Sequence, residues 1–181
     1  LQLCYNSAFV WGPSGKIIFT QAKAQPVQFA EPWKPAESQE CWQSPWGPIG
    51  IAICFDISFR RVMDVLVEQG AELLIIPAID PIAWGAYEHV LDARNTPIRA
   101  AEYGVPVIRV CSSGISQAVS PSGYEIATAS FPGQGELLVA QLPMQAGSRP
   151  IDVLLALPAG LLFAIVIAYG MFTWLYSYIK R

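Results

Sequence analysis

Cys54 is the residue whose type and position best suit covalent chemistry. It directly follows the apolar run 49–53, which Gly47 and Pro48 precede, and such a run is typical of a strand buried on both faces. The segment 59–70 then has the period of a helix and ends at a glycine. A cysteine at this strand-to-helix turn is expected at the rim of a sheet, near a helix N-terminus that favours a thiolate. Because free cysteines are also common core residues, its position alone leaves a packing role open.

A cysteine nucleophile needs a basic or cationic neighbour, since the pKa of a free thiol is about 8.5. His89 is the single histidine, but it falls in the middle of a predicted helix, which favours a structural role. Lys23 is the better candidate, because it follows a predicted strand and opens a segment that ends at Glu31. A lone lysine in a loop is normally solvated, so the residues by themselves leave both interpretations of Lys23 open.

Alternating strands and helices are predicted to position these residues. Strands are predicted over residues 3–11, 16–20, 49–53, 73–77, 105–110, 115–119, 124–129 and 136–142. Helices are predicted over 59–70 and 85–103, the second of which Pro97 should kink. Residues 21–48 are rich in proline and glutamine and predict a long loop. This order indicates an α/β fold with a β-hairpin at each end.

The C-terminal segment differs in kind from the rest. Residues 153–179 hold no charge, and about twenty apolar residues suffice to cross a hydrocarbon core of about 30 Å. A transmembrane helix is therefore predicted from Pro158, placed in its first turn, to Ile179; a buried core helix fits this length poorly. Aromatic residues gather just before Lys180 and Arg181, as an interfacial belt does beside a cytoplasmic anchor. The C-terminus is accordingly predicted to be cytoplasmic, with the α/β domain on the other side.

Composition excludes several classes of function. The chain has 181 residues, is 53% hydrophobic and 14% charged, and carries a net charge of −3. No basic patch larger than the pair Arg60-Arg61 exists, so a nucleic-acid partner is not expected. The four cysteines show no CxxC or His-Cys spacing, so no metal site is predicted, and no cofactor is expected. Because the cysteines are widely spaced and the chain is long enough for a large core, no disulfide is predicted.

Several motifs occur in an order that resembles a known superfamily. They are Tyr5-Asn6-Ser7-Ala8, Gly12-Pro13-Ser14-Gly15-Lys16, Lys23, Phe29-Ala30-Glu31, Cys54-Phe55-Asp56, Trp84-Gly85, Glu88-His89, Arg94, residues 99–109 and residues 113–116. This set is similar to the nitrilase (carbon–nitrogen hydrolase) superfamily, and within it to the apolipoprotein N-acyltransferases, its membrane branch. The resemblance implies a partial nitrilase-like α-β-β-α sandwich over residues 1–147, followed by a juxtamembrane segment and one transmembrane helix within 148–181.

The resemblance also implies a mechanism. Cys54 attacks the ester carbonyl of a phospholipid acyl chain and becomes a thioester, while Lys23 and the backbone N–H of Phe55 face the oxyanion. Glu31 orients the lysine or relays a proton, and Asp56 adjoins the site. The amine of a lipoprotein's N-terminal diacylglyceryl-cysteine then takes the acyl group. Such an enzyme lies in the bacterial inner membrane with its catalytic domain on the periplasmic side, so one lipid bilayer holds both substrates.

The sequence departs from the superfamily pattern at three points. Phe55-Asp56 stands where the N-acyltransferases usually have Tyr-Glu. Ile79-Asp80-Pro81-Ile82-Ala83 stands where they have an Asn-Asp pair before Trp-Gly. The general-base glutamate of the superfamily lies well upstream of the lysine, before Leu1. The chain is therefore expected to be a C-terminal fragment that does not turn over by itself.

Two other functions fit the same residues. A membrane-anchored amidase or nitrilase would use them to hydrolyse a C–N bond, and a non-catalytic membrane-tethered scaffold would retain them as a decayed site. An acyltransferase needs an apolar entrance that faces the membrane, and Trp33, Trp42 and Trp46 are expected to line it. The entrance therefore distinguishes an acyltransferase from an amidase.

Overall fold

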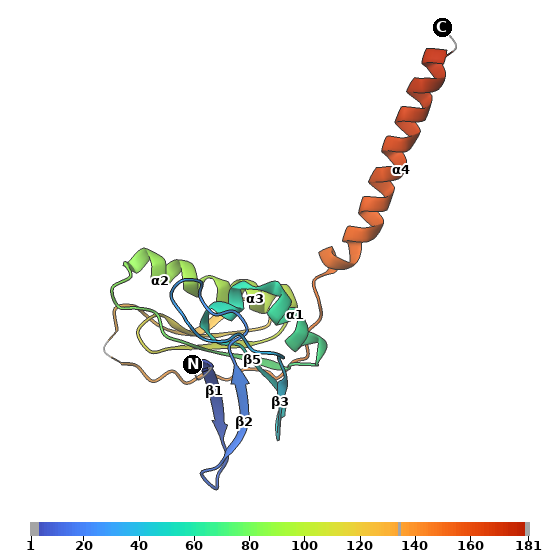
Figure 1. The fold of residues 1–181 in the computed structure, drawn as a ribbon. Coiled ribbons are helices and arrows are strands. Elements are labelled where there is room, and N and C mark those ends of the chain that lie inside the picture. The colour runs from blue at the N-terminus through green and yellow to red at the C-terminus, as the bar shows by residue number, and fades with distance from the viewer. Residues whose placement is uncertain (1–3, 134, 180–181) are drawn as a thin grey trace. The chain divides into compact units, whose positions relative to one another are not determined.

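Helices and strands alternate along the chain, as the sequence predicts. The computed structural model describes residues 4–133 and 135–179; Leu3, the predicted start of the first strand, lies outside them. The order of elements is β1 (Ser7–Trp11), β2 (Ile17–Ala22), β3 (Cys41–Ser44), β4 (Gly47–Ile51), the 3-10 helix η1 (Cys54–Ser58), α1 (Arg60–Glu68), β5 (Leu73–Ala78), α2 (Ala86–Ala93), α3 (Asn95–Tyr103), β6 (Val107–Cys111), β7 (Ser116–Val119), β8 (Glu125–Ala129) and α4 (Ile151–Ile179) (Figure 1). These elements divide into two units, Leu1–Ser148 and Arg149–Arg181.

Strands β3 to β8 form a six-stranded sheet in sequence order. Its centre is parallel, because β4 pairs in parallel with β5 and β5 with β6. The crossover from β4 to β5 contains η1 and α1, and the crossover from β5 to β6 contains α2 and α3. Its edges, where β3 pairs with β4 and β7 pairs with β6 and β8, are antiparallel. The carboxyl ends of β4, β5 and β6 therefore meet at one end of the sheet, where α/β proteins commonly bind their ligands.

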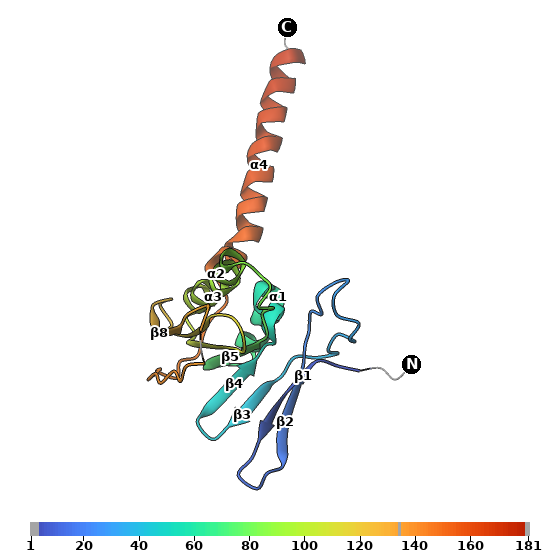
Figure 2. The ribbon, with the colours of Figure 1, turned by 90° about the vertical axis from the view of Figure 1, so that its left-hand side faces the viewer.

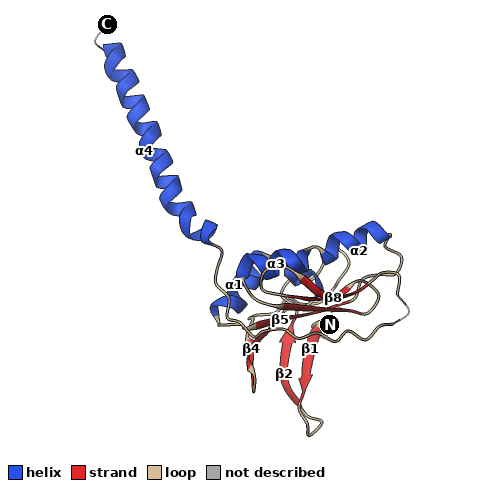
Figure 3. Ribbon diagram, turned by 180° about the vertical axis from the view of Figure 1, so that it is seen from behind, coloured by secondary structure: helices blue, strands red, loops and turns tan. Residues whose placement is uncertain are grey.

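Both faces of this sheet are covered, which explains the continuous apolar run of β5. Leu74 shares a buried cluster with Leu66 of α1 on one face. Leu73 and Ile75 project to the other face, where they belong to a second cluster with Phe19 of β2. Figure 3 shows helices α1 to α3 on one side of the sheet and the β1–β2 hairpin on the other. Figure 2 shows that hairpin beside β3 and β4. The α/β layering predicted from the sequence is thus confirmed.

The predicted helices are confirmed, with one difference in where they break. Gly70 follows α1 with a φ of 85°, and Gly104 follows α3 with a φ of 67°, as expected of residues that end helices. The predicted helix 85–103 is two helices that meet at Arg94, not one helix kinked at Pro97. Pro97 lies instead in the first turn of α3, where its missing N–H removes no helical hydrogen bond.

Two predictions for the irregular segments are wrong. Residues 41–44, predicted as part of a loop, form β3 and pair antiparallel with β4. Their short mixed pattern carries no strand signal of its own, so the pairing with β4 creates the strand. Residues 136–142, predicted as a strand, are irregular. Leu142 nevertheless packs against the cluster that contains Leu73, so the apolar character of this segment serves packing and not pairing.

Helix α4 makes up most of the second unit. Its stretch Leu157–Tyr176 has 20 residues with a mean hydropathy of 1.8, and none of the stretch is buried within the protein. By length and composition it is sufficient to cross a membrane, which agrees with the predicted span. The predicted position of Pro158 in the first helical turn is wrong. Because α4 begins at Ile151, Pro158 lies inside the helix. Lys180 and Arg181, predicted as a cytoplasmic anchor, lie outside the described residues.

Candidate active site

Cys54 is the first residue of η1, shortly after β4 ends at Ile51, so the predicted strand-to-helix turn is confirmed. Its backbone φ is +52°, in the left-handed region that non-glycine residues rarely adopt. Backbone strain of this kind costs about 1–3 kcal/mol and commonly marks a functional side chain. The residue is half-buried, and it lines a pocket near the carboxyl ends of the parallel strands.

Lys23 forms an ion pair with Glu31, in which the lysine is buried and the glutamate is partly buried. Lys23 Nζ lies 2.8 Å from Glu31 Oε2, and the Lys23 side chain is only 2% exposed, so its interpretation as a solvated loop lysine is wrong. Glu31 also accepts hydrogen bonds from the Val27 N–H at 2.7 Å and from the Asn6 side-chain amide at 3.2 Å. Burial acts to raise the pKa of Glu31, but the hydrogen bonds from Lys23 and Val27 and the lysine charge lower it overall. The ionised carboxylate therefore holds the ammonium in a fixed place.

Cys54, Lys23 and Glu31 line one pocket of about 520 Å³, which we call the Cys54 pocket. Its other lining residues are Asn6, Ser7, Ala8, Ile53, Pro77, Ala78, Ile79, Val110 and Ser112. The three residues come from separate segments: one follows β2, one lies in the loop before β3 and one follows β4. The fold thus brings together the three side chains for which the resemblance implies catalytic roles, and those roles stay predictions.

Asp56 connects the residues that follow Lys23 to the residue that precedes Cys54. Its fully buried carboxylate accepts three hydrogen bonds from backbone N–H groups. The donors are Ala24 at 3.1 Å, Gln25 at 2.7 Å and Ile53 at 3.0 Å. Because these donors directly follow Lys23 and directly precede Cys54, one side chain sets the spacing between the ammonium and the thiol. Burial raises the pKa of Asp56, and the three N–H donors oppose that rise.

Phe55 does not contribute its side chain to the Cys54 pocket. Its ring packs edge-on against Phe59, with the ring centroids 5.0 Å apart, and it lines a different pocket together with Trp84. The role of its backbone N–H as an oxyanion donor stays a prediction.

Burial raises the pKa of the Cys54 thiol above its usual value. The charge of Lys23 and the backbone N–H of Ile79 act in the opposite direction, while the carboxylates of Asp92 and Asp80 add to the rise. The thiolate expected near a helix N-terminus is therefore not favoured, because the effect of burial is the largest of these contributions. A nucleophilic role for Cys54 would therefore require a base to take its proton.

A second set of buried charges lies at the carboxyl ends of β5 and β6, and sequence reasoning did not identify it. Arg109 is fully buried, and its Nη2 lies 3.0 and 2.8 Å from the two Asp80 oxygens and 2.5 Å from Asp92 Oδ2. Its Nε donates to the carbonyl of Ile115 at 3.2 Å. The cluster ties together the loop after β5, helix α2 and the β6–β7 loop. An arginine inside the apolar strand predicted at 105–110 is the signal that could have found it.

His89, the single histidine, lies outside the Cys54 pocket. The His89 ring is fully buried and stacks on Phe131, with the ring centroids 3.6 Å apart. Its Nδ1 lies 3.7 Å from Asp80 Oδ2, which is too long for a hydrogen bond, and it does not line the Cys54 pocket. No group of three or more His, Cys, Asp or Glu among the described residues could hold a metal ion.

The predicted tryptophan entrance is wrong. None of Trp33, Trp42 and Trp46 lines the Cys54 pocket. Trp42 and Trp46 contact each other at the β3–β4 hairpin instead, with their ring centroids 6.2 Å apart. The exposed apolar side chains of the lining are Ile79 and Val110, which follow β5 and belong to β6. Exposed apolar side chains therefore line this pocket, but the loop after β5 and strand β6 supply them.

Comparison with protein families matches residues 1–149 to the carbon–nitrogen hydrolase family. The apolipoprotein N-acyltransferase of Rhizobium rhizogenes is 30% identical over 159 residues, which cover 72% of this chain and 28% of that protein. The omega-amidase NIT2-B of Xenopus laevis is 25% identical over 144 residues, which cover 70% of this chain and 52% of that protein. The chain thus spans about half or less of the length of these relatives.

A solved structure gives the same result for the fold. Saccharomyces cerevisiae Nit3, a member of the nitrilase superfamily, superposes with a TM-score of 0.62 at 24% identity, over 74% of this chain and 51% of Nit3. The nitrilase-like α/β fold predicted from the sequence is therefore confirmed.

Proposed function

The chain belongs to the carbon–nitrogen hydrolase family, and we propose that it is the catalytic part of a membrane-anchored N-acyltransferase. The observation that supports this proposal is that one chain contains both a pocket with reactive groups and a helix that could cross a membrane. A pocket contains a thiol and a buried ammonium, and a separate helix is long and apolar enough to cross a membrane. The proposed acyl donor is a phospholipid, and the proposed acceptor is the N-terminal cysteine amine of a lipoprotein.

In the proposed first step, the Cys54 sulfur attacks the ester carbonyl of the phospholipid. A base takes the thiol proton as the C–S bond forms, and it returns that proton to the leaving lysophospholipid oxygen as the C–O bond of the ester breaks. Lys23 Nζ and the N–H of Phe55 stabilise the oxyanion that forms on the way. The ion pair of Lys23 and Glu31 supports this role, because it holds the ammonium rigidly where little water competes.

In the proposed second step, the acceptor amine attacks the thioester carbonyl. The C–N bond forms, the C–S bond breaks, and the amine proton returns to the Cys54 sulfur. Glu31 orients Lys23 or relays this proton, and it is the carboxylate that the Cys54 pocket contains. Asp56 acts indirectly in both steps, because its three hydrogen bonds from backbone N–H groups keep Lys23 and Cys54 at a fixed spacing.

We place the enzyme in the bacterial inner membrane, with the catalytic unit on the periplasmic side and the C-terminus in the cytoplasm. The apolar stretch Leu157–Tyr176 supports an anchor of this kind. A shared lipid bilayer would then hold donor, acceptor and enzyme together. With a net charge of −3 and no basic patch larger than the pair Arg60-Arg61, the chain is not proposed to bind nucleic acid.

Hydrolysis of an amide is the second candidate, favoured by the similarity to an omega-amidase. The same cysteine, lysine and glutamate would serve it, and water would release the thioester in place of an amine. The two functions therefore differ in the donor that forms the thioester and in the nucleophile that releases it.

The experiment uses the full-length protein in phospholipid vesicles whose lipids carry a labelled acyl chain. We expect label on Cys54 as a hydroxylamine-sensitive thioester, found by mass spectrometry, and its transfer to the amine of a diacylglyceryl-cysteine peptide. Cys54→Ala should abolish both signals. Cys4→Ala, which removes an exposed cysteine outside the pocket, should leave them unchanged.

Two outcomes would contradict the acyltransferase. Loss of the label to water in the presence of the peptide, together with Cys54-dependent cleavage of small amides, would establish an amidase. A Cys54 that forms no thioester with either class of substrate would instead support the membrane-tethered scaffold.

A further inference from the structure

A second pocket adjoins the Cys54 pocket and has no part in the chemistry described so far. Its volume is about 450 Å³, within the range of small-ligand sites. Serine side chains from two loops and β7 line it, so we call it the serine pocket. These serines are Ser112, Ser113, Ser116 and Ser130. Because Ser112 lines both pockets, the two pockets are neighbours.

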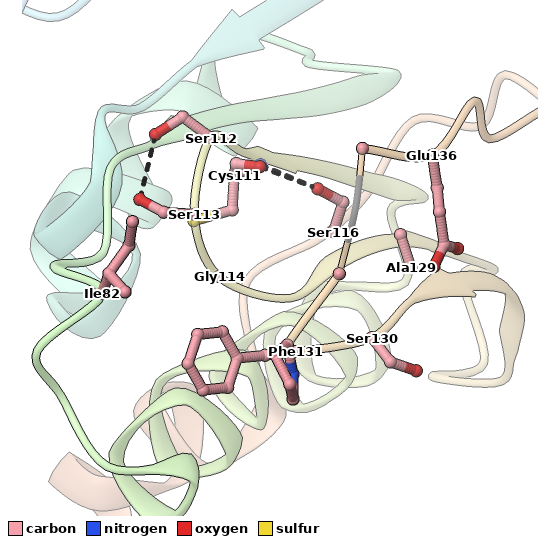
Figure 4. A pocket seen from close by; sticks show the side chains of 13 residues that line it. Ile82, Cys111, Ser112, Ser113, Gly114, Ser116, Ala129, Ser130, Phe131 and Glu136 are labelled. Atoms are coloured by element: carbon pink, nitrogen blue, oxygen red, sulfur yellow. Dashed lines mark hydrogen bonds between the residues drawn. The ribbon is translucent and has the colours of Figure 1, made fainter.

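The serine pocket offers hydroxyl groups and a carboxylate, and none of the described residues that line it has a cationic side chain. Figure 4 shows Ser112 and Ser113 on one side of the pocket and Ser130 and Glu136 on the other. Ser113 Oγ donates to the carbonyl of Asp80 at 2.6 Å, which fixes that wall to the loop after β5. Within the part of the chain that the structure describes, Glu136 has no ion pair or hydrogen bond. Its carboxylate is therefore available to a ligand.

The buried charge cluster adds to the negative potential of this pocket. Gly114 lines the pocket, and a Cβ at this position would lie 2.2 Å from Asp80 Oδ2, so the carboxylate packs directly behind it. There the single guanidinium of Arg109 faces the two carboxylates of Asp80 and Asp92. Together with Glu136 on the wall, carboxylates outnumber cations around the pocket. A cationic ligand is thus favoured over a phosphate group.

We propose that the serine pocket binds the acceptor of the transfer reaction, recognised as a primary ammonium on a polar peptide chain, an inference that rests on the proposed acyltransferase function. The carboxylates attract the ammonium, and the hydroxyl groups of the serines both donate to and accept from peptide groups. The acyl chain occupies the Cys54 pocket, whose exposed apolar residues are Ile79 and Val110. The ammonium releases a proton to solvent, and the neutral amine reaches the thioester past Ser112, which both pockets share.

Two substitutions test this assignment in the full-length enzyme. Ser130→Phe fills the pocket, and Glu136→Gln removes the charge while it keeps the shape. We expect Ser130→Phe to raise KM for a diacylglyceryl-cysteine peptide about tenfold, as other losses of fit in a binding pocket do. Glu136→Gln should raise it about two- to fivefold, as expected for one partly exposed charge pair. Neither should change the rate of thioester formation on Cys54.

The matched controls lie at the opposite end of the β7–β8 hairpin. Ser122→Phe adds the same ring at the exposed turn, and Glu125→Gln removes the same charge from the start of β8. Both should leave KM for the peptide unchanged. Circular dichroism of each variant, compared with the parent, checks that the fold is retained.

A binding measurement makes the inference independent of turnover. In full-length protein carrying Cys54→Ala, a fluorescent diacylglyceryl-cysteine peptide with a free amine should bind more tightly than its N-acetylated counterpart. Glu136→Gln in the same background should reduce this preference, because one of the carboxylates that distinguish an ammonium from a neutral amide is lost.

Other outcomes would contradict either the acceptor site or the proposed function. Equal binding of the amine and N-acetyl peptides, or an unchanged KM in a folded Ser130→Phe variant, would overturn the acceptor site. Slower thioester formation in either variant would assign the pocket to the phospholipid donor, which also overturns it. Amine-selective binding by a parent protein that forms no thioester would support the ammonium site and contradict the proposed function alone.

Discussion

Asp56 and Asp80 are both fully buried carboxylates, yet the protein satisfies their charges in different ways. Asp56 accepts three hydrogen bonds from backbone N–H groups. Asp80 meets the guanidinium of Arg109 at 3.0 and 2.8 Å. The chain path fixes backbone donors without adding a charge, whereas a guanidinium brings a charge that must itself be neutralised. Asp56 therefore fixes the spacing between two chain segments, whereas Asp80 neutralises a buried cation.

This difference predicts different consequences of mutation. The partners of Asp56 flank Lys23 and Cys54, so a change there alters the geometry of the Cys54 pocket. The partners of Asp80 join β6 and the loop after β5, so a change there alters stability at the end of the sheet. Removal of one partner from a buried ion pair costs about 3–5 kcal/mol, whereas an unsatisfied neutral hydrogen-bonding group costs about 1–3 kcal/mol.

The largest effect is expected at Arg109. Arg109→Met should destabilise the protein by about 3–5 kcal/mol, because the carboxylates of Asp80 and Asp92 lose their shared cation. Urea denaturation of the full-length protein measures this loss. Lys34→Met, which breaks an exposed pair with Glu37, is the control and should change the midpoint little. Equal stability of the two variants would show that the cluster does not balance charge as described.

Lys23 should give the next largest effect, on rate and not only on stability. Lys23→Ala should slow thioester formation on Cys54 by about 10²–10³, as loss of one oxyanion donor does elsewhere. Lys23→Arg should not restore the rate, because a planar guanidinium cannot replace a compact ammonium at one oxygen. Lys34→Ala is the matched control. A near-parent thioester rate in Lys23→Ala would remove the assignment of the lysine.

Asp56 separates a positioning role from a purely structural one. Asp56→Ala leaves its backbone N–H donors without their acceptor and should cost about 1–3 kcal/mol of stability, whereas Asp56→Asn retains one acceptor oxygen and should cost less. In Asp56→Asn the maximal rate of thioester formation should fall while KM for the phospholipid stays near the parent value. If the rate per folded molecule stays at the parent level, Asp56 only stabilises the fold.

The smallest effect is a shift in the pH dependence of Cys54 alkylation. Burial raises the pKa of this thiol, so at any pH below that pKa the folded protein holds less thiolate than the unfolded chain. Its alkylation rate should therefore rise with pH and reach half of its maximum at a higher pH than in the unfolded chain. Lys23→Met should move this midpoint further up and Asp92→Asn should move it down, because the lysine lowers the pKa and Asp92 raises it. Iodoacetamide labelling followed by mass spectrometry gives the midpoint, and faster labelling of folded Cys54 near neutral pH would contradict the raised pKa.

Local patterns determined much of this structure. The apolar run before Cys54, the helical period of 59–70 and the uncharged segment 153–179 each predict their element, because period and turn chemistry act over a few residues. The same local signals place Cys54 at its turn. The resemblance of the ordered motifs to the nitrilase superfamily then indicates Lys23 and Glu31 as site residues.

Only the tertiary structure decided which partners these residues have. Strand β3 exists because β4 lies beside it, and the break at Arg94 depends on how α2 and α3 pack. Asp56 and the N–H of Ala24 are 32 residues apart in sequence, and Arg109 lies 29 residues from Asp80. Hydrogen bonds over such separations depend on chain crossings and burial, and no local period encodes either. For the same reason the raised pKa of Cys54 could not be predicted, because the water excluded around a thiol is a property of the assembled fold.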